Sequence, residues 1–166
     1  MATYPIRMYG DPVLRMEAKP VIDIDSAVHS LVRDMIETMY DAPGVGLAAS
    51  QIGIPRRVAV FDVQDELGAR VMINPEIVEK SGEWEFEEGC LSVPDRYWPI
   101  VRPGFVRVKA LDLDGNEVEL AGDGLVGRVL QHEVDHLDGY LLVDRLPKRV
   151  RKNALKELRE EALGLE

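Results

Sequence analysis

The 166-residue chain carries 30 acidic and 20 basic side chains, which gives a formal net charge of −10 at pH 7. Its 46% hydrophobic and 30% charged residues are typical of a folded globular protein and exclude a mainly disordered chain, and the length fits one compact domain over residues 1–166. The acidic excess disfavours tight binding to nucleic acid or to an anionic membrane.

The first predicted element is a helix over residues 26–40. Apolar side chains recur there at spacings of three and four, as one face of a helix requires, and Asp25 or Ser26 can cap its start. Pro43 and Gly44 follow its end. The apolar face consists of Val28, Leu31, Val32, Met35, Ile36 and Met39.

Strand-like segments dominate the middle of the chain. They cover residues 57–62, 71–78, 83–87, 106–113 and 118–120. Asp114 and Gly115 form a hairpin turn signal between the last two segments. A helix over residues 125–137 should end at Gly139, and a charged surface helix is expected over residues 148–163. Strands followed by segregated helices predict an α+β fold rather than a doubly wound sheet.

Cys90 is the only cysteine, so no intramolecular disulfide can form and a reducing compartment is expected. Residues 1–7 lack the apolar core of a signal peptide and the long basic stretch of a transit peptide. No run of about 18 apolar residues could cross a membrane. We therefore expect a cytoplasmic protein. The basic segment 148–152 departs locally from the acidic balance and is interpreted as the solvated start of a helix.

Residues 132–136 read His-Glu-Val-Asp-His, an HExxH pattern. On a helix, positions i and i+4 share a face, so His132 and His136 can reach one metal ion while Glu133 lies beside the open coordination position. The chain has only three histidines, and His29 on the first helix is interpreted as a bystander. Apolar neighbours predict the burial that a metal site requires: Val126, Val129, Leu130 and Leu137.

A catalytic metal site needs a third protein ligand and one open position. No histidine follows His136, although downstream carboxylates exist. Cys90 offers a thiolate, which is a strong ligand for Zn²⁺ or Fe²⁺. Gly89 lets the backbone approach closely and Pro94 fixes the exit. Two other interpretations of Cys90 stay open, a small buried hydrophobe and a nucleophile with a histidine base.

Three segments together resemble the motifs of the peptide deformylase family. Residues 44–51 (GVGLAASQ) resemble its motif GφGφAAxQ, residues 88–92 (EGCLS) its motif EGCφS, and residues 131–139 (QHEVDHLDG) its motif QHExDHφxG. Their order and spacing also fit, and residues 6–15 resemble the N-terminal segment of the family. The resemblance extends over residues 5–146.

This resemblance implies a fold of mostly antiparallel strands packed around a central HExxH helix, with an N-terminal helix and a C-terminal surface helix. It implies a metal held by Cys90, His132 and His136. The expected ion is one Fe²⁺ in the cell, with Zn²⁺, Ni²⁺ or Co²⁺ as substitutes.

The resemblance also implies a reaction. The metal enzyme would hydrolyse the N-formyl group from the N-terminal formylmethionine of nascent proteins and release formate, with Glu133 as the catalytic acid and base. The side-chain amide of Gln51 and the backbone N–H of Leu91 would face the formyl oxygen. N-formylmethionyl peptides are therefore the expected partner. A transient ribosome contact stays an open hypothesis, and neither specific nucleic-acid recognition nor membrane binding is expected.

A formylmethionine substrate needs an apolar pocket for its side chain. The candidate substrate-binding residues are Gly44, Val45, Gly46, Phe86, Glu88, Gly89, Leu125, Arg128 and Val129. Gly44 and Gly46 would let the peptide pair with the chain as an extra strand, and Glu88 would belong to a network behind the metal ligands. The alternatives are core positions for the apolar residues, turn positions for the glycines and a solvated charge for Glu88.

Arg128 lies four residues before His132, on the helix face of both histidines. Its stem is expected to line the pocket while its guanidinium reaches the mouth. Arg128→Leu is then expected to change peptide affinity more than metal content. Arg96 and Tyr97 are weaker candidates for gripping the substrate.

Two rival functions remain. The first is an HExxH endopeptidase that uses a downstream carboxylate as third ligand and would keep its metal in Cys90→Ala. The second is a deformylase-like fold that serves only as a binding module. The presence of Cys90, both HExxH histidines and Glu133 argues against this second interpretation.

Overall fold

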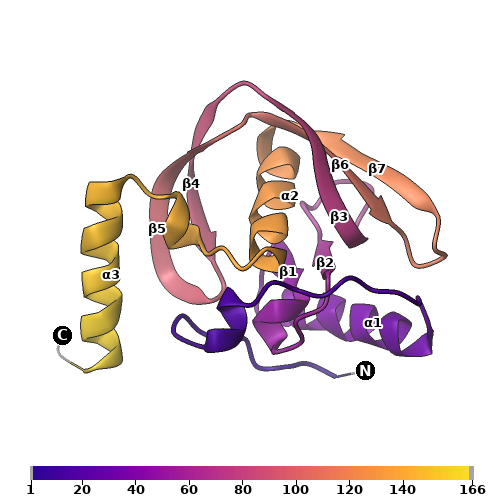
Figure 1. The fold of residues 1–166 in the computed structure, drawn as a ribbon, viewed down its shortest axis with the longest axis horizontal. Coiled ribbons are helices and arrows are strands. Elements are labelled where there is room, and N and C mark those ends of the chain that lie inside the picture. Colours follow the sequence, from indigo (N-terminus) through magenta and orange to yellow (C-terminus); the bar gives the residue numbers. More distant parts are fainter. Residues whose placement is uncertain (1, 165–166) are drawn as a thin grey trace.

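The computed structural model describes residues 2–164. Figure 1 shows helix α2 in the middle of the molecule, surrounded by strands, with α1 below it and α3 to one side. In residues 2–164, no helix has both the length and the apolar character that a membrane span requires.

The helices and strands follow the chain in this order. They are α1 (Ser26–Asp41), β1 (Gly46–Ala48), β2 (Val58–Phe61), β3 (Arg70–Ser81), β4 (Trp84–Cys90), β5 (Val93–Arg102), β6 (Phe105–Leu111), β7 (Glu117–Gly122), α2 (Gly124–Leu137) and α3 (Lys148–Ala162). Three single-turn 3₁₀ helices connect them: η1 (Pro12–Arg15), η2 (Ala49–Ile52) and η3 (Leu142–Arg145). The predicted α+β class is confirmed.

Five strands form one antiparallel sheet in the order β1-β2-β3-β6-β7. All four residues of β2 are buried, because α1 covers one face of this end of the sheet and α2 covers the other. The hairpin of β6 and β7 forms around Asp114 and Gly115 as predicted, with Gly115 at φ +81°. Both strands of this hairpin contact α2, and the hairpin turn lies away from that helix (Figure 1).

Helix α1 forms where the apolar spacing predicts it. Asp25 caps it by accepting a hydrogen bond from the backbone N–H of Val28 at 3.0 Å. Its buried face packs on β1 and β2, and both Met35 and Met39 are fully buried there.

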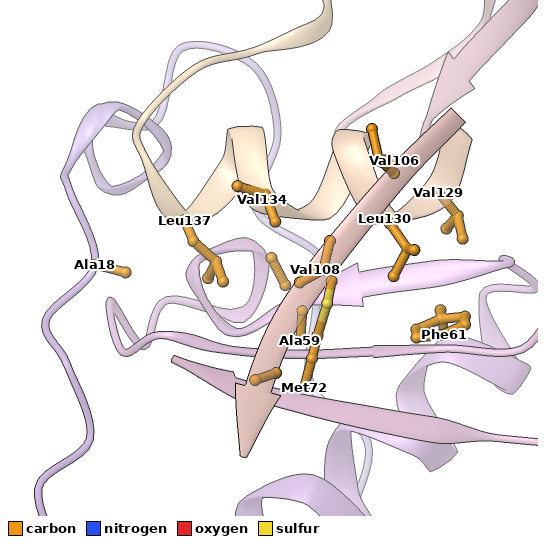
Figure 2. Packing of buried hydrophobic residues seen from close by; sticks show 12 residues of the cluster. Ala18, Ala59, Phe61, Met72, Val106, Val108, Val129, Leu130, Val134 and Leu137 are labelled. Atoms are coloured by element: carbon orange, nitrogen blue, oxygen red, sulfur yellow. The ribbon is translucent and has the colours of Figure 1, made fainter. Parts of the chain in front are cut away.

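Helix α2 packs across the sheet through four apolar side chains. Figure 2 shows Val129, Leu130, Val134 and Leu137 above Ala59, Phe61 and Met72 of the sheet, and Val108 of β6 belongs to the same cluster. Gly127 permits this close approach, because a Cβ at that position would lie 2.5 Å from the backbone oxygen of Gly122. The helix that carries the HExxH pattern is thus packed into the hydrophobic core.

Strands β4 and β5 form a separate two-stranded antiparallel sheet. Neither β5 nor the three-residue β1 was among the predicted strands. Pro94 and Pro99 interrupt the pattern of β5, yet a two-stranded sheet tolerates proline because half of its backbone donors point away from the partner strand. β1 is too short to show an alternating pattern.

Helix α3 stands beside β5 at the edge of the molecule (Figure 1). Only Ala154 and Leu158 of this helix are buried. They join a cluster with apolar side chains of β5 and η3, including Val93, Ile100 and Leu142. The predicted C-terminal surface helix is therefore present, attached by a narrow apolar stripe.

Candidate metal centre

A cavity of about 900 Å³ opens between β1, β4 and the first turns of α2. Fourteen of its lining residues were named from the sequence as candidates for the metal site, for catalysis or for substrate binding. They are Gly44, Val45, Gly46, Gln51, Phe86, Glu88, Gly89, Cys90, Leu91, Leu125, Arg128, Val129, His132 and Glu133. The structure therefore brings these candidates around one space.

Cys90, His132 and His136 converge at the inner end of this cavity. Cys90 is the last residue of β4, and the two histidines lie one turn apart on α2. The sulfur of Cys90 is 3.3 Å from Nε2 of His136, and the two Nε2 atoms are 3.2 Å apart. Within residues 2–164 these three form a group whose ligand atoms all lie within 4.8 Å of one another.

Glu88 fixes the orientation of His132. Its carboxylate lies 2.8 Å from Nδ1 of His132, which turns Nε2 toward Cys90 and His136. A hydrogen bond from Nδ1–H to a carboxylate is the usual partner of a metal-binding imidazole. Burial alone would raise the pKa of Glu88, but hydrogen bonds from His132 and Arg102 lower it to about 2.

Arg102 holds Glu88 in turn. Its guanidinium donates two hydrogen bonds to Glu88, at 2.9 and 2.7 Å, and a third to Asp135 at 2.8 Å. Asp135 also accepts two hydrogen bonds from Arg145. Charges therefore alternate from the surface to His132. Arg102 was not predicted, because its partners lie 14 and 33 residues away in the chain and no local pattern indicates them.

The protonation state of the cluster suits a cation. Burial would raise the pKa of the Cys90 thiol, but the positive charge of His136 and hydrogen bonds from both imidazoles bring it well below its usual value. The sulfur is then a thiolate, the form that binds metals. One soft thiolate and two imidazoles match the ligands that Zn²⁺ and Fe²⁺ take in proteins.

Glu133 faces the same space from α2. Its side chain is buried, and its Oε2 has no hydrogen-bond partner among the described residues. Burial raises the pKa of Glu133 to about 6, against the opposing effect of the two imidazoles. A Cβ on Gly46 would lie 2.7 Å from Oε1 of Glu133, so glycine at this position keeps room for the carboxylate.

Gln51 reaches the cluster from η2. Its Oε1 accepts a hydrogen bond from the N–H of Ala48 at 2.9 Å, so its Nε2 points toward Ser92 at 3.2 Å and toward the sulfur of Cys90 at 3.7 Å. Leu91 follows Cys90 directly and packs against Gly44, where a Cβ would meet the Leu91 side chain at 2.7 Å. Both donors expected at the formyl oxygen thus border the ligand cluster.

Arg128 corrects one expectation. Its stem lines the cavity, but its guanidinium does not reach the mouth, since the residue is only 2% exposed. The guanidinium instead donates to the carbonyls of Trp84 and Ile100, at 2.5 and 3.0 Å, and lies 3.3 Å from Glu88. A buried cation needs such partners, and they lie on β4 and β5 rather than in solvent.

Several lining residues were not predicted. They are Ile6, Met8, Ala42, Pro43, Gln64, Glu87, Val93, Pro94 and Asp95. Most belong to irregular segments, where no periodic pattern marks the exposed face. Gln64 has a positive φ of 62°, a backbone feature that the sequence does not reveal. Tyr97 lies over Gly89, where a Cβ would be 2.5 Å from its ring.

Known proteins resemble this chain in sequence and in fold. A sequence model described as polypeptide deformylase matches residues 3–152. A peptide deformylase of Cellvibrio japonicus is 49% identical over 98% of this chain and 98% of its own. The structure of a peptide deformylase from Thermus thermophilus superposes with a TM-score of 0.90 at 45% identity, over 98% of this chain and 97% of its own.

A third relative is described with a peptide bound. The class I type b peptide deformylase of Acinetobacter baumannii, with Met-Ala-Ser bound, gives a TM-score of 0.81 at 38% identity, over 87% of this chain and 98% of its own. Sequence, fold and the convergence of the three motifs around one cavity agree. The chain belongs to the polypeptide deformylase family, metal-dependent hydrolases that remove the N-formyl group from nascent peptides.

Proposed function

We propose that this chain holds one divalent cation with Cys90, His132 and His136 and uses it to deformylate N-formylmethionyl peptides. The observation that carries this assignment is the convergence of the three ligand atoms beside the unpartnered carboxylate oxygen of Glu133. Fe²⁺ is the ion proposed for the cell, where availability selects the metal, and Zn²⁺, Ni²⁺ or Co²⁺ can replace it.

When bound, the cation polarises a carbonyl and lowers the pKa of water from about 15.7 to near 7. Glu133 accepts the proton of the attacking water as the new bond to the formyl carbon forms. The C–N bond then breaks, and Glu133 returns the proton to the leaving amine. The products are formate and a free N-terminus, so atoms and charge balance without a further reactant.

Gln51 and Leu91 are proposed to stabilise the charge that develops on the formyl oxygen. The Nε2 of Gln51 already points toward Cys90, and Leu91 follows Cys90 at the cavity wall. One donor placed at a developing oxyanion is typically worth about 3–4 kcal/mol. The hydrogen bond from Ala48 to the other end of the Gln51 amide keeps the NH₂ group turned inward.

The peptide is proposed to bind as an added strand. Within residues 2–164, β1 is an edge strand of the five-stranded sheet and β4 pairs only with β5, so each has an unpaired edge. Gly44, Val45 and Gly46 offer backbone groups on one side of the cavity and Gly89 on the other. Unpaired edges recognise extended peptides through main-chain hydrogen bonds.

The methionine side chain is assigned to the apolar part of the cavity. Phe86, Leu125 and Val129 line it, and the stem of Arg128 closes its floor. Glu88 is not proposed to touch the peptide; it holds His132 and the two arginines. We propose a cytoplasmic location, because nascent chains are the proposed substrates.

A formate-release assay tests the proposal. The protein is loaded with Fe²⁺, Ni²⁺ or Zn²⁺ and given formyl-Met-Ala-Ser, whose deformylated form is the tripeptide bound to the Acinetobacter baumannii relative. We expect formate release that stops with a chelator and returns with added metal. Cys90→Ala should lose both metal and activity.

Two outcomes would overturn the assignment. Cleavage of internal peptide bonds by a Cys90→Ala variant that keeps its metal would identify an endopeptidase with another third ligand. Tight binding of the formyl peptide without any formate, in protein shown to contain metal, would identify a binding module.

A further inference from the structure

The start of β5 forms a bulge at the outer end of the cavity. Cys90 pairs with Val93 and Gly89 with Tyr97, so Pro94, Asp95 and Arg96 have no opposite residues on β4. Asp95 has a positive φ of 64°, which turns the chain sharply. All three bulge residues line the cavity.

Helix α3 holds the tip of this bulge. Nε and Nη2 of Arg96 donate to one carboxylate oxygen of Glu161, at 3.2 and 2.6 Å, and Nη1 donates to Glu157 at 2.9 Å. All three guanidinium nitrogens therefore bind α3, 61 and 65 residues farther along the chain. The Arg96 side chain is 24% exposed.

These contacts determine the charge of the cavity mouth. Glu87, Asp95 and Arg96 are its charged residues outside the buried network. Glu157 and Glu161 neutralise the one cation among them and hold its guanidinium through three hydrogen bonds. The mouth is then left with an acidic excess from Glu87 and Asp95, both exposed.

We propose that α3 is a specificity element: Glu157 and Glu161 position Arg96 and so determine how the cavity mouth discriminates between acidic and basic residues downstream of the formylmethionine. This inference rests on the proposed function. With α3 intact, a basic residue near the mouth is favoured over an acidic one. Without the two carboxylates, Arg96 can turn into the mouth and attract an acidic side chain.

The experiment compares Glu157→Gln/Glu161→Gln with Glu160→Gln, which removes a charge from the same helix at a position rotated by about 100° from Glu161 around the helix axis. Each is made with Arg96 and with Arg96→Ala. The substrates are formyl-Met peptide amides with a single Glu or Lys at the third or fourth position. Circular dichroism and thermal melts establish that every variant is folded.

We expect the double variant to lower KM for the Glu peptides relative to the Lys peptides by about two- to fivefold, the effect of an exposed ion pair. The kcat should not change. The shift should disappear at about 1 M salt, where screening reaches a few ångströms. Glu160→Gln should leave the ratio unchanged, and the Arg96→Ala background should abolish the effect.

Three results would overturn the inference. The ratio of KM for the Glu peptides to KM for the Lys peptides could stay constant in the double variant. It could also shift equally in Glu160→Gln. Finally, it could shift equally in the Arg96→Ala background, which would show that the helix acts through its general electrostatic field. In each case formate release by the wild type shows that the proposed function holds. No release from any peptide by metal-loaded wild type would instead remove the proposed function itself.

Discussion

Helices α2 and α3 have nearly the same length, 14 and 15 residues, but opposite surroundings. Nine residues of α2 are buried, and four of these are polar or charged: Arg128, Gln131, Glu133 and His136. On α3 only Ala154 and Leu158 are buried, and its charges lie in water.

The difference between the two helices shows in which surroundings electrostatic contacts affect stability. On α2 burial removes water from the polar groups, which costs free energy unless a new hydrogen bond replaces it. Arg128 and Gln131 therefore donate to backbone carbonyls, and His132 binds Glu88. Among the described residues, Oε2 of Glu133, Nε of Arg128 and Nδ1 of His136 are the buried polar atoms of α2 without such a partner. On α3 water solvates each charge, so its ion pairs influence orientation more than stability.

The largest expected difference between the helices comes from single glutamates. Glu133→Ala removes the proposed proton carrier, and loss of such a group typically lowers turnover by about 10² to 10⁴-fold. Metal content, measured by elemental analysis, should stay near one ion per chain because the three ligands remain. The matched change on α3, Glu160→Ala, should leave turnover unchanged. Near wild-type turnover of Glu133→Ala would remove this residue from the mechanism.

Alanine substitutions on the two helices should also change the free energy of unfolding in opposite directions. Replacing glycine by alanine inside an exposed helix usually stabilises it by about 1 kcal/mol. At Gly127 the new Cβ would lie 2.5 Å from the backbone oxygen of Gly122, and backbone cannot move aside easily. Overpacking of this kind costs about 1–3 kcal/mol.

We expect Gly127→Ala to lie at the upper end of that range, whereas Asn153→Ala on the exposed face of α3 should raise stability by a few tenths, about 0.3 kcal/mol. Urea denaturation of both variants measures the two free energies of unfolding. A neutral Gly127→Ala would mean that α2 can shift relative to β7, contrary to the close contact.

The third test concerns the support behind α2. Glu88→Gln weakens the acceptor of the His132 ring and the partner of Arg102, and loss of such a contact typically lowers metal affinity by about 10- to 100-fold. Chelator competition measures this affinity. Glu85→Gln makes the same charge change at an exposed position of the same strand and should bind metal like the wild type. Equal affinities would show that packing alone orients His132.

The same contrast explains what could be predicted from the sequence. All three helices were found, because their faces meet core or water with a regular period. β5 was missed because Pro94 and Pro99 argue against a strand unless it is known to lie at a sheet edge, as it does in this two-stranded sheet. The prediction for Arg128 was partly correct. Helical spacing puts its stem at the cavity, but only the fold supplies the carbonyls of Trp84 and Ile100 that bind its guanidinium in the interior.

The last test concerns an exposed arginine of α3. Arg151 lies 3.2 Å from Asp144, with its side chain 46% exposed. Asp144 keeps the ion pair with Arg15 and the hydrogen bond from the N–H of Leu141 without it. Arg151→Ala should therefore change the free energy of unfolding by at most about 0.5 kcal/mol.

Urea denaturation at low and high salt measures this change in the free energy of unfolding, and any loss should shrink as salt rises because an exposed pair is screened. A salt-independent loss above about 1 kcal/mol, beyond the usual range of exposed pairs, would mean that the stem of Arg151 packs on η3 and that α3 is held by more than its narrow apolar stripe.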